Sequence, residues 1–106
     1  MTARYDRKPC LRGDTLLGWS VDIAIDDAPA EIASARLHLC TEAGRLVYAW
    51  PVAIAGNRIT LADVPAQETA RWPTGRLEYD LEVTLASGRT VTWLAGTQPI
   101  IPDRTR

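Results

Sequence analysis

Strict alternation of apolar and polar side chains is the feature that most constrains the fold of this chain. It is clearest between Arg76 and Leu85, where every second residue is apolar and the residues between them are charged or polar. The apolar residues are Leu77, Tyr79, Leu81, Val83 and Leu85. Side chains of a β-strand point alternately to opposite faces, whereas a helix would spread these large residues around its circumference. The segment is therefore predicted to be a strand with one buried and one solvated face.

Shorter runs of the same alternation divide the rest of the chain. Their apolar sets are Leu17, Trp19, Val21, Ile23 and Ile25; Ala35, Leu37 and Leu39; Leu46, Tyr48 and Trp50; Ile59 and Leu61; and Val91 and Trp93. Turns that contain Gly44, Gly56 and Gly88 separate several of these sets, and glycine supplies the positive φ that a hairpin needs. We therefore predict an all-β, antiparallel, immunoglobulin- or fibronectin-III-like β-sandwich of about seven strands.

Two segments interrupt the strand pattern. The first, Asp26 to Ser34, is predicted to be a loop with at most one helical turn. The second, Ala62 to Gly75, is interpreted as the crossover from one sheet to the other, with a short helix near residues 64–71. Asp63 is the expected cap of this helix, because its carboxylate can accept a hydrogen bond from an unpaired backbone N–H of the first turn. Pro73 would end the helix.

The length and charge of the chain limit its class. Residues 1–106 are expected to form a single domain, with the ends at 1–9 and 102–106 flexible or held by a partner. Twelve basic and thirteen acidic side chains give a net charge of -1, which lacks the basic excess that binding to nucleic acid or an anionic membrane needs. No apolar run reaches the length of a membrane-spanning helix, and the first residues do not read as a secretory signal. We expect an intracellular protein.

The cysteines and the histidine do not form a recognisable reactive centre. Cys10 and Cys40 could form a disulfide or half of a metal site, but intracellular chains rarely keep disulfides. Together with His38, the one histidine, they make a poor zinc set, because structural zinc takes four ligands at tight spacings. His38 has no evident relay partner and is interpreted as a solvated surface imidazole.

An acidic row, Glu78, Asp80 and Glu82, projects from one face of the clearest strand. Such a row could bind calcium, but calcium ligands usually come from a bent loop that wraps the ion. We interpret the row as a solvated sheet face, paired across strands with Arg36 or Arg89. No catalytic residue, cofactor or metal is therefore expected, and the protein is predicted not to be an enzyme.

The four tryptophans supply much of the large aromatic volume, since the chain has no phenylalanine. Trp19 and Trp93 are in phase with the apolar residues of their strands and are predicted to be core residues. Trp50 stands beside Pro51, and Trp72 lies in the crossover. These two are the candidates for an exposed interaction surface, because an aromatic ring at a surface can stack on a ligand.

The pattern W-P-x-G-x-x-x-Y runs from position 72 to position 79. It resembles the tyrosine corner of fibronectin type III domains and related immunoglobulin-like sandwiches. Trp72, Pro73, Gly75 and Tyr79 would take its parts. The resemblance implies a structural role for Tyr79, whose hydroxyl would bond back to the backbone of the crossover.

A second pattern is spread over most of the chain. It consists of Gly13-Asp14-Thr15, Gly75, Tyr79-Asp80, Val83, Gly88, Thr92 and Gly96, with Leu77 in place of an aromatic residue. In this pattern the chain resembles small immunoglobulin-like proteins and domains of tailed bacteriophages and prophages, including the N-terminal domain of baseplate upper proteins. The resemblance implies a non-catalytic virion structural or assembly protein, such as a tail, baseplate or connector component.

Partners and location follow from the same resemblance. The implied partners are other virion proteins and further copies of the chain, with no nucleic acid and no membrane. The implied location is the bacterial cytoplasm during assembly and then the virion. The alternative hypothesis is a ligand- or receptor-binding module that uses the exposed aromatic residues Trp50 and Trp72.

The triplet Arg12-Gly13-Asp14 has the letters of an adhesion signal found in integrin-binding proteins. Gly13 and Asp14 also have the chemistry of a bend, and Thr15 is predicted to start the first long strand. Because three-residue matches are mostly chance, we interpret the triplet as a strand entry.

Overall fold

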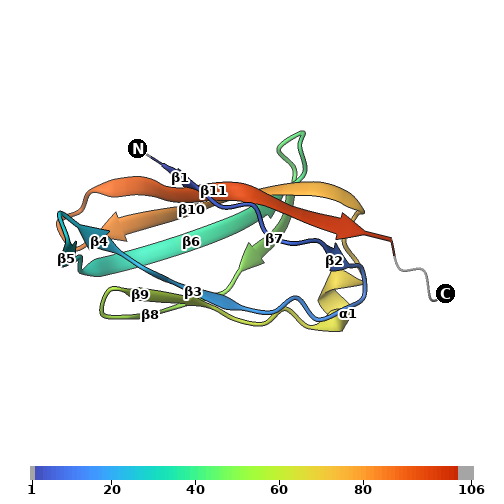
Figure 1. The fold of residues 1–106 in the computed structure, drawn as a ribbon, viewed down its shortest axis with the longest axis horizontal. Coiled ribbons are helices and arrows are strands. Elements are labelled where there is room, and N and C mark those ends of the chain that lie inside the picture. Colours follow the sequence, from blue (N-terminus) through green and yellow to red (C-terminus); the bar gives the residue numbers. More distant parts are fainter. Residues whose placement is uncertain (1, 103–106) are drawn as a thin grey trace.

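The computed structural model describes residues 2–102, which form two β-sheets packed face to face and a separate two-stranded hairpin, β4-β5 (Figure 1). Most of these residues lie in strands. In chain order the elements are β1 (Ala3–Arg4), β2 (Cys10–Leu11), β3 (Trp19–Asp22), β4 (Ala24–Ile25), β5 (Ala28–Pro29), β6 (Ile32–Cys40), β7 (Leu46–Trp50), β8 (Val52–Ala55), β9 (Arg58–Leu61), α1 (Ala66–Thr69), β10 (Gly75–Leu85) and β11 (Thr90–Ile101).

The order of the strands is that of an immunoglobulin-like sandwich. The large sheet runs β1-β11-β10-β6-β7, with β2 also paired to β11, and the small sheet runs β3-β9-β8. The long strand β10 is antiparallel to both β6 and β11, whereas β1 and β2 are parallel to β11. The chain leaves the small sheet after β9 and enters the large sheet at β10, so the segment with α1 is the predicted crossover. The predicted fold class is confirmed.

The core lies between the two sheets and is built from the alternating residues. In β10 the predicted inward set Leu77, Tyr79, Leu81, Val83 and Leu85 is buried throughout. Leu37 and Leu39 of β6, together with Ile59 and Leu61 of β9, are also buried. Removing such apolar surface from water stabilises the fold by about 25 cal/mol per Å². The alternation therefore predicted the inward face of the longest strands correctly.

The first predicted strand differs from the structure at its start. Leu17 was expected to be buried, but 67% of it is exposed, and its neighbour Leu16 is buried in an isolated bridge with Val64. Strand β3 begins only at Trp19, so Thr15 does not start a strand. Gly18 lies very close to the backbone that follows β9, where a Cβ atom on Gly18 would lie 2.1 Å from the carbonyl oxygen of Leu61. The chain bends at this contact, and the alternation changes phase.

The crossover helix is shorter than predicted and is capped differently. Helix α1 covers Ala66–Thr69, and its N-cap, Pro65, makes no side-chain cap bond. Asp63 does not cap the helix, because its Oδ1 accepts a hydrogen bond from the Gly18 backbone N–H at 2.6 Å. Asp63 therefore does not cap α1 but joins the crossover to the bend that precedes β3.

The N-terminal segment lies along the edge of β11. The backbone N–H of Tyr5 donates to Ala95 O at 2.9 Å, and that of Arg7 donates to Thr97 O at 2.8 Å. Residues 1–9 were expected to be flexible or held by a partner; in the structure β1 and the backbone N–H groups of Tyr5 and Arg7 pair with β11 of the same chain. At the other end β11 stops at Ile101, and residues 103–106 lie outside the described part of the chain.

Candidate functional site

The two tryptophans predicted to form an exposed surface are core residues. Trp50 is 3% exposed and Trp72 is 2% exposed. The indole N–H of Trp50 donates to Ala62 O at 2.6 Å, and that of Trp72 donates to Glu68 Oε2 at 2.9 Å. The two rings are therefore not exposed as predicted. The in-phase position of Trp50 after Tyr48 was the signal of burial.

The other two tryptophans lie at the margin of the core. Trp19 and Trp93 are half-buried and pack against the buried cluster, so their prediction as core residues holds in part. Trp93 stands at the irregular register between Leu81 and Glu82 of β10, which explains its partial exposure.

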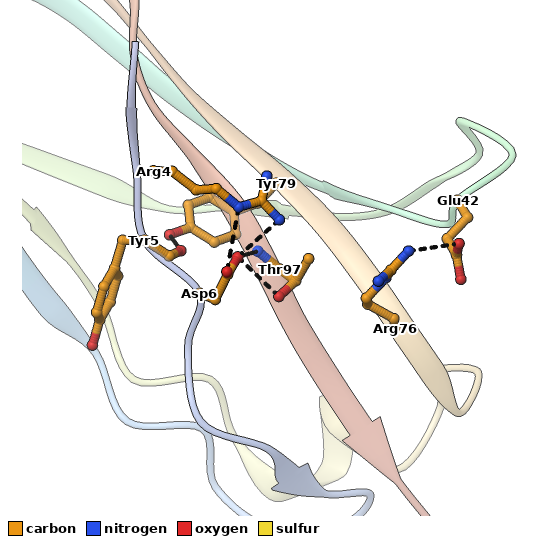
Figure 2. A network of polar contacts seen from close by, with 7 residues as sticks. All are labelled: Arg4, Tyr5, Asp6, Glu42, Arg76, Tyr79 and Thr97. Atoms are coloured by element: carbon orange, nitrogen blue, oxygen red, sulfur yellow. Dashed lines mark hydrogen bonds and ion pairs between the residues drawn. The ribbon is translucent and has the colours of Figure 1, made fainter.

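Tyr79 makes a different hydrogen bond from the one that its motif implied. Its side chain is buried, and its hydroxyl donates to the backbone oxygen of Tyr5, in the N-terminal segment (Figure 2). The predicted bond to the crossover is therefore wrong. Pro73 and Gly75 do form the turn into β10, where Gly75 has a φ of 116° that favours glycine. Tyr79 thus links the large sheet to the segment that covers its edge.

A polar cluster fastens this segment at Asp6 (Figure 2). Asp6 Oδ1 accepts hydrogen bonds from the backbone N–H of Thr97 at 3.1 Å and from its hydroxyl at 3.2 Å. Arg4 pairs with the same carboxylate at 3.1 Å. Burial acts to raise the pKa of Asp6, but the bonds from Thr97 and Arg4 outweigh it and hold the pKa below its usual value.

Arg7 continues the attachment towards the core. Its guanidinium carbon lies 4.8 Å from the ring centroid of Trp19 and 5.3 Å from that of Trp50. Its Nε donates to the buried Gln98 at 2.7 Å, and its second nitrogen donates to Leu17 O at 3.1 Å. Since these donors already have partners, the Arg7 cluster is a structural attachment and does not offer a binding site.

A cavity of about 520 Å³ near α1 has a different character. We call it the arginine cavity. It is lined by Arg12, Thr41, Arg45, Leu46, Val47, Glu68, Arg71, Trp72 and Pro73. Its three arginines come from separate segments, namely the turn after β2, the β6–β7 turn and the stretch after α1. This convergence makes the cavity the candidate functional site.

Two rigid turns position the arginines. Gly13, with a φ of 93°, allows the Leu11–Asp14 turn, in which Asp14 N–H donates to Leu11 O at 3.0 Å. The buried hydroxyl of Thr69 accepts from Gly13 N–H at 3.1 Å and donates to Asp14 O at 2.7 Å. The backbone of the turn that carries Arg12 is therefore tied to α1, while the Arg12 side chain is exposed. The bend predicted at Gly13 is confirmed, and Thr69 ties the backbone of the triplet to α1.

The second turn fixes Arg45. Gly44, with a φ of 90°, closes the turn, and Thr41 N–H donates to Arg45 O at 2.8 Å. The Thr41 hydroxyl oxygen accepts from Arg45 N–H at 3.1 Å, so the hydroxyl hydrogen of Thr41 is left to donate elsewhere.

The cavity carries excess positive charge. Glu68 is the carboxylate in its lining, and one of its oxygens already accepts the Trp72 indole N–H. Its other oxygen lies 3.9 Å from the guanidinium of Arg71. Within residues 2–102, the side chains of Arg12 and Arg45 have neither an ion pair nor a hydrogen bond. Among residues 2–102, three positive groups and one negative group line the cavity and leave it a net charge of +2, on a chain whose total is -1.

The residues weighed for chemistry lie elsewhere. His38 is half-buried in β6, opposite Asp80 of β10, and Glu82 of the acidic row pairs with Arg36 at 3.1 Å as predicted. Cys10 and Cys40 are free thiols, and burial raises the pKa of both. Across the described range, no three His, Cys, Asp or Glu side chains are grouped so as to hold a metal ion. The same range has no helix with the length and hydropathy of a membrane span.

Comparison with known proteins gives a likeness of fold only. No protein-family model matches the chain, and no curated protein matches it. A solved structure, CopC from Methylosinus trichosporium OB3b, is similar with a TM-score of 0.56. The match covers 99% of this chain and 88% of CopC, at 11% sequence identity. At this identity the likeness supports the β-sandwich architecture and carries no activity over to this chain.

The comparison also corrects the predicted function. The prediction of a phage or prophage virion component is wrong, because the structural likeness leads to CopC and nothing found points to phage proteins. The residues that suggested the phage resemblance were turn glycines and alternating strand positions. These features recur in many sandwiches, so they specified the fold and not the biological context.

Proposed function

We propose that the protein is a non-catalytic binding domain that holds a negatively charged ligand in the arginine cavity. The observation that carries the proposal is the placing of Arg12 and Arg45, without side-chain partners in residues 2–102, around one concave site. Its volume of about 520 Å³ is within the usual range of ligand sites, about 300–1,000 Å³.

The chemistry of guanidinium groups supports an anion as the ligand. Each guanidinium presents several N–H donors in a planar fork that matches carboxylate and phosphate oxygens. Positive groups around a hollow with partly apolar walls also concentrate the electrostatic field inside it. An anion entering the cavity would supply a counter-charge that no side chain of residues 2–102 gives to Arg12 or Arg45.

The same lining supports binding without catalysis. A catalytic site would need a nucleophile with an adjacent base, or an acid and a base facing the same space. The cavity offers the Thr41 hydroxyl without a histidine beside it, and Glu68 is already engaged by Trp72. His38 lies in β6 and is not part of the lining.

The test is a binding measurement on the whole chain by titration calorimetry. The probes are benzoate, phenyl sulfate, phenyl phosphate and uncharged phenol. We expect an anion to bind and phenol not to bind. The double variant Arg12→Gln, Arg45→Gln should lose about tenfold or more in affinity, because each guanidinium supplies charge-assisted hydrogen bonds.

Arg89→Gln is the matched control. Arg89 is also an exposed arginine of a tight turn, but it lies between β10 and β11 and outside the arginine cavity. This variant should bind like the wild type. The proposal fails if none of the three anions binds, or if Arg89→Gln weakens binding as much as the double variant does.

A second candidate role, association with another copy of the chain, is favoured by β8. This strand forms an edge of the small sheet, and its sequence Val-Ala-Ile-Ala contains no charge. Ile54 is 37% exposed although it pairs with the buried Ile59 in the neighbouring strand. An uncharged edge with free backbone donors and acceptors is a template for pairing with another strand, and two copies of β8 would meet without charge repulsion.

A further inference from the structure

Resting on the function proposed above, we infer that the ligand of the arginine cavity is a phosphate monoester dianion attached to an apolar or aromatic body. Charge, donor arrangement and the composition of the lining lead to this class.

The charge of the cavity matches a dianion better than a monoanion. Arg12, Arg45 and Arg71 outnumber Glu68 by two charges. A phosphate monoester carries a charge of about −1.5 to −2 at pH 7, because its second pKa is about 6. A carboxylate or a sulfate ester carries a single negative charge and would leave one positive charge of the cavity without compensation.

The donors of the cavity come from several directions. Each of the three arginines belongs to a different segment, and two of these segments are turns tied down by backbone hydrogen bonds. The hydroxyl hydrogen of Thr41 adds a further donor, since its oxygen already accepts from Arg45 N–H. A phosphoryl group of a monoester has three terminal oxygens to receive such donors, whereas a planar carboxylate has two.

The remaining lining is apolar and suits the body of the ligand. Leu46 is 52% exposed, and Val47, Trp72 and Pro73 line the same cavity. Trp72 is 2% exposed and its indole N–H is bonded to Glu68, so the accessible apolar surface of the lining comes mainly from Leu46, Val47 and Pro73. Apolar surface beside a charged head group favours an organic ester over inorganic phosphate.

The experiment compares phenyl phosphate with phenyl sulfate, which has the same tetrahedral shape but one charge less at neutral pH. Both are titrated into the wild-type chain at pH 7.5 and at pH 5.0, with inorganic phosphate as a third probe. We expect phenyl phosphate to bind about tenfold or more tightly than phenyl sulfate at pH 7.5, because the dianion makes stronger charge-assisted hydrogen bonds. Inorganic phosphate should bind more weakly than phenyl phosphate.

The affinity for phenyl phosphate should fall as the pH is lowered. Phenyl phosphate becomes a monoanion below its second pKa of about 6, so its advantage over phenyl sulfate should be largely lost at pH 5.0. Phenyl sulfate remains a monoanion at both pH values, and its own affinity change reports any titration of the protein. The charged groups that line the cavity are Arg12, Arg45, Arg71 and Glu68, and the sulfate control includes all of them.

The outcomes separate this inference from the function on which it rests. If phenyl sulfate binds as tightly as phenyl phosphate at pH 7.5, the dianion assignment is overturned while anion binding stands. Equal affinities for inorganic phosphate and phenyl phosphate would overturn the inference that the ligand has an apolar or aromatic body. If no anion binds, or if Arg45→Gln leaves the binding of phenyl phosphate unchanged while Arg89→Gln weakens it, both proposals fail.

Discussion

Tyr79 shows how much of this fold depends on a single hydroxyl. Its O–H donates to Tyr5 O, so a buried residue of the large sheet holds the N-terminal segment in place. Gly96 lies opposite Tyr79 in β11, and a Cβ atom there would lie 1.8 Å from Tyr5 O. The absence of a side chain at Gly96 therefore allows the segment to approach. Burial, the largest influence, raises the pKa of Tyr79 to about 12.

The raised pKa of Tyr79 predicts a loss of stability at high pH. The pKa is about 12 in the folded chain against 10.0 for a free tyrosine, so the folded state keeps its proton when the unfolded state has lost it. The stabilisation is fully present below pH 10 and is lost as the pH rises towards 12. Urea unfolding at pH 7, 10 and 11.5 would measure how the free energy of unfolding changes with pH.

Tyr79→Phe is the control for this prediction. At pH 7 it should lower the free energy of unfolding by about 1 kcal/mol, because Tyr5 O loses its hydrogen bond. The variant should also show a shallower decline between pH 10 and 11.5 than the wild type. Equal slopes in the two proteins would show that Tyr79 does not cause the alkaline loss.

At the scale of elements, the alternation of apolar and polar residues predicted the buried face correctly where a strand is long and has a neighbouring strand on each side. Strand β10 has β6 and β11 as neighbours, so its inward face is buried along its whole length and its pattern is strict. Strand β8 is short and lies at an edge, where the same periodicity leaves Ile54 partly exposed. The prediction of α1 failed at its ends, because Asp63 binds Gly18 across the fold and no local pattern reports such a contact.

The edge strand β8 carries a prediction about self-association. Wild-type chain should form a concentration-dependent dimer in sedimentation velocity, because β8 is uncharged and has no strand on its outer side in the described part of the chain. Ile54→Lys should raise the dissociation constant by about tenfold or more, since it places like charges at the shared edge.

The matched variant for this test is Thr60→Lys. Thr60 is exposed on β9, the central strand of the small sheet, so a lysine there adds the same charge away from the edge. It should leave the dimer unchanged. A wild-type chain that stays monomeric at millimolar concentration, or equal effects of the two lysines, would exclude β8 as the contact.

At the scale of the whole molecule, the candidate site illustrates what a single sequence leaves open. Arg12 and Arg45 are 33 residues apart along the chain and Arg45 and Arg71 are 26 apart, and each belongs to a turn or a segment that follows an element. Neither strand periodicity nor turn composition relates such distant positions. Only the packing of the two sheets and α1 brings them to one cavity. The sequence suggested Trp50 and Trp72 as the surface residues of a binding site, but both are buried in the core.

The N-terminal segment carries a prediction for the intact fold. Deleting residues 1–9 should lower the stability and promote aggregation, because it uncovers the edge of β11 and removes the partners of Tyr79 and Gln98. Thioflavin fluorescence and light scattering of the truncated and full chains would measure the effect. Substituting Arg36 by Gln, far from this edge, should leave both signals at the wild-type level.

The position of β1 and β2 along β11 also decides how many neighbours the large sheet can accept. Within residues 2–102 one long side of that sheet is occupied by its own chain, and β7 is the outer strand on the other side. A sheet with two open sides can add strands from both and grow into a fibre, whereas a sheet with one open side can join a single neighbour through it. Strands β1 and β2 have only two residues each, so the N-terminal segment replaces the long edge of β11 by a short, interrupted one that offers few backbone groups to a neighbouring sheet.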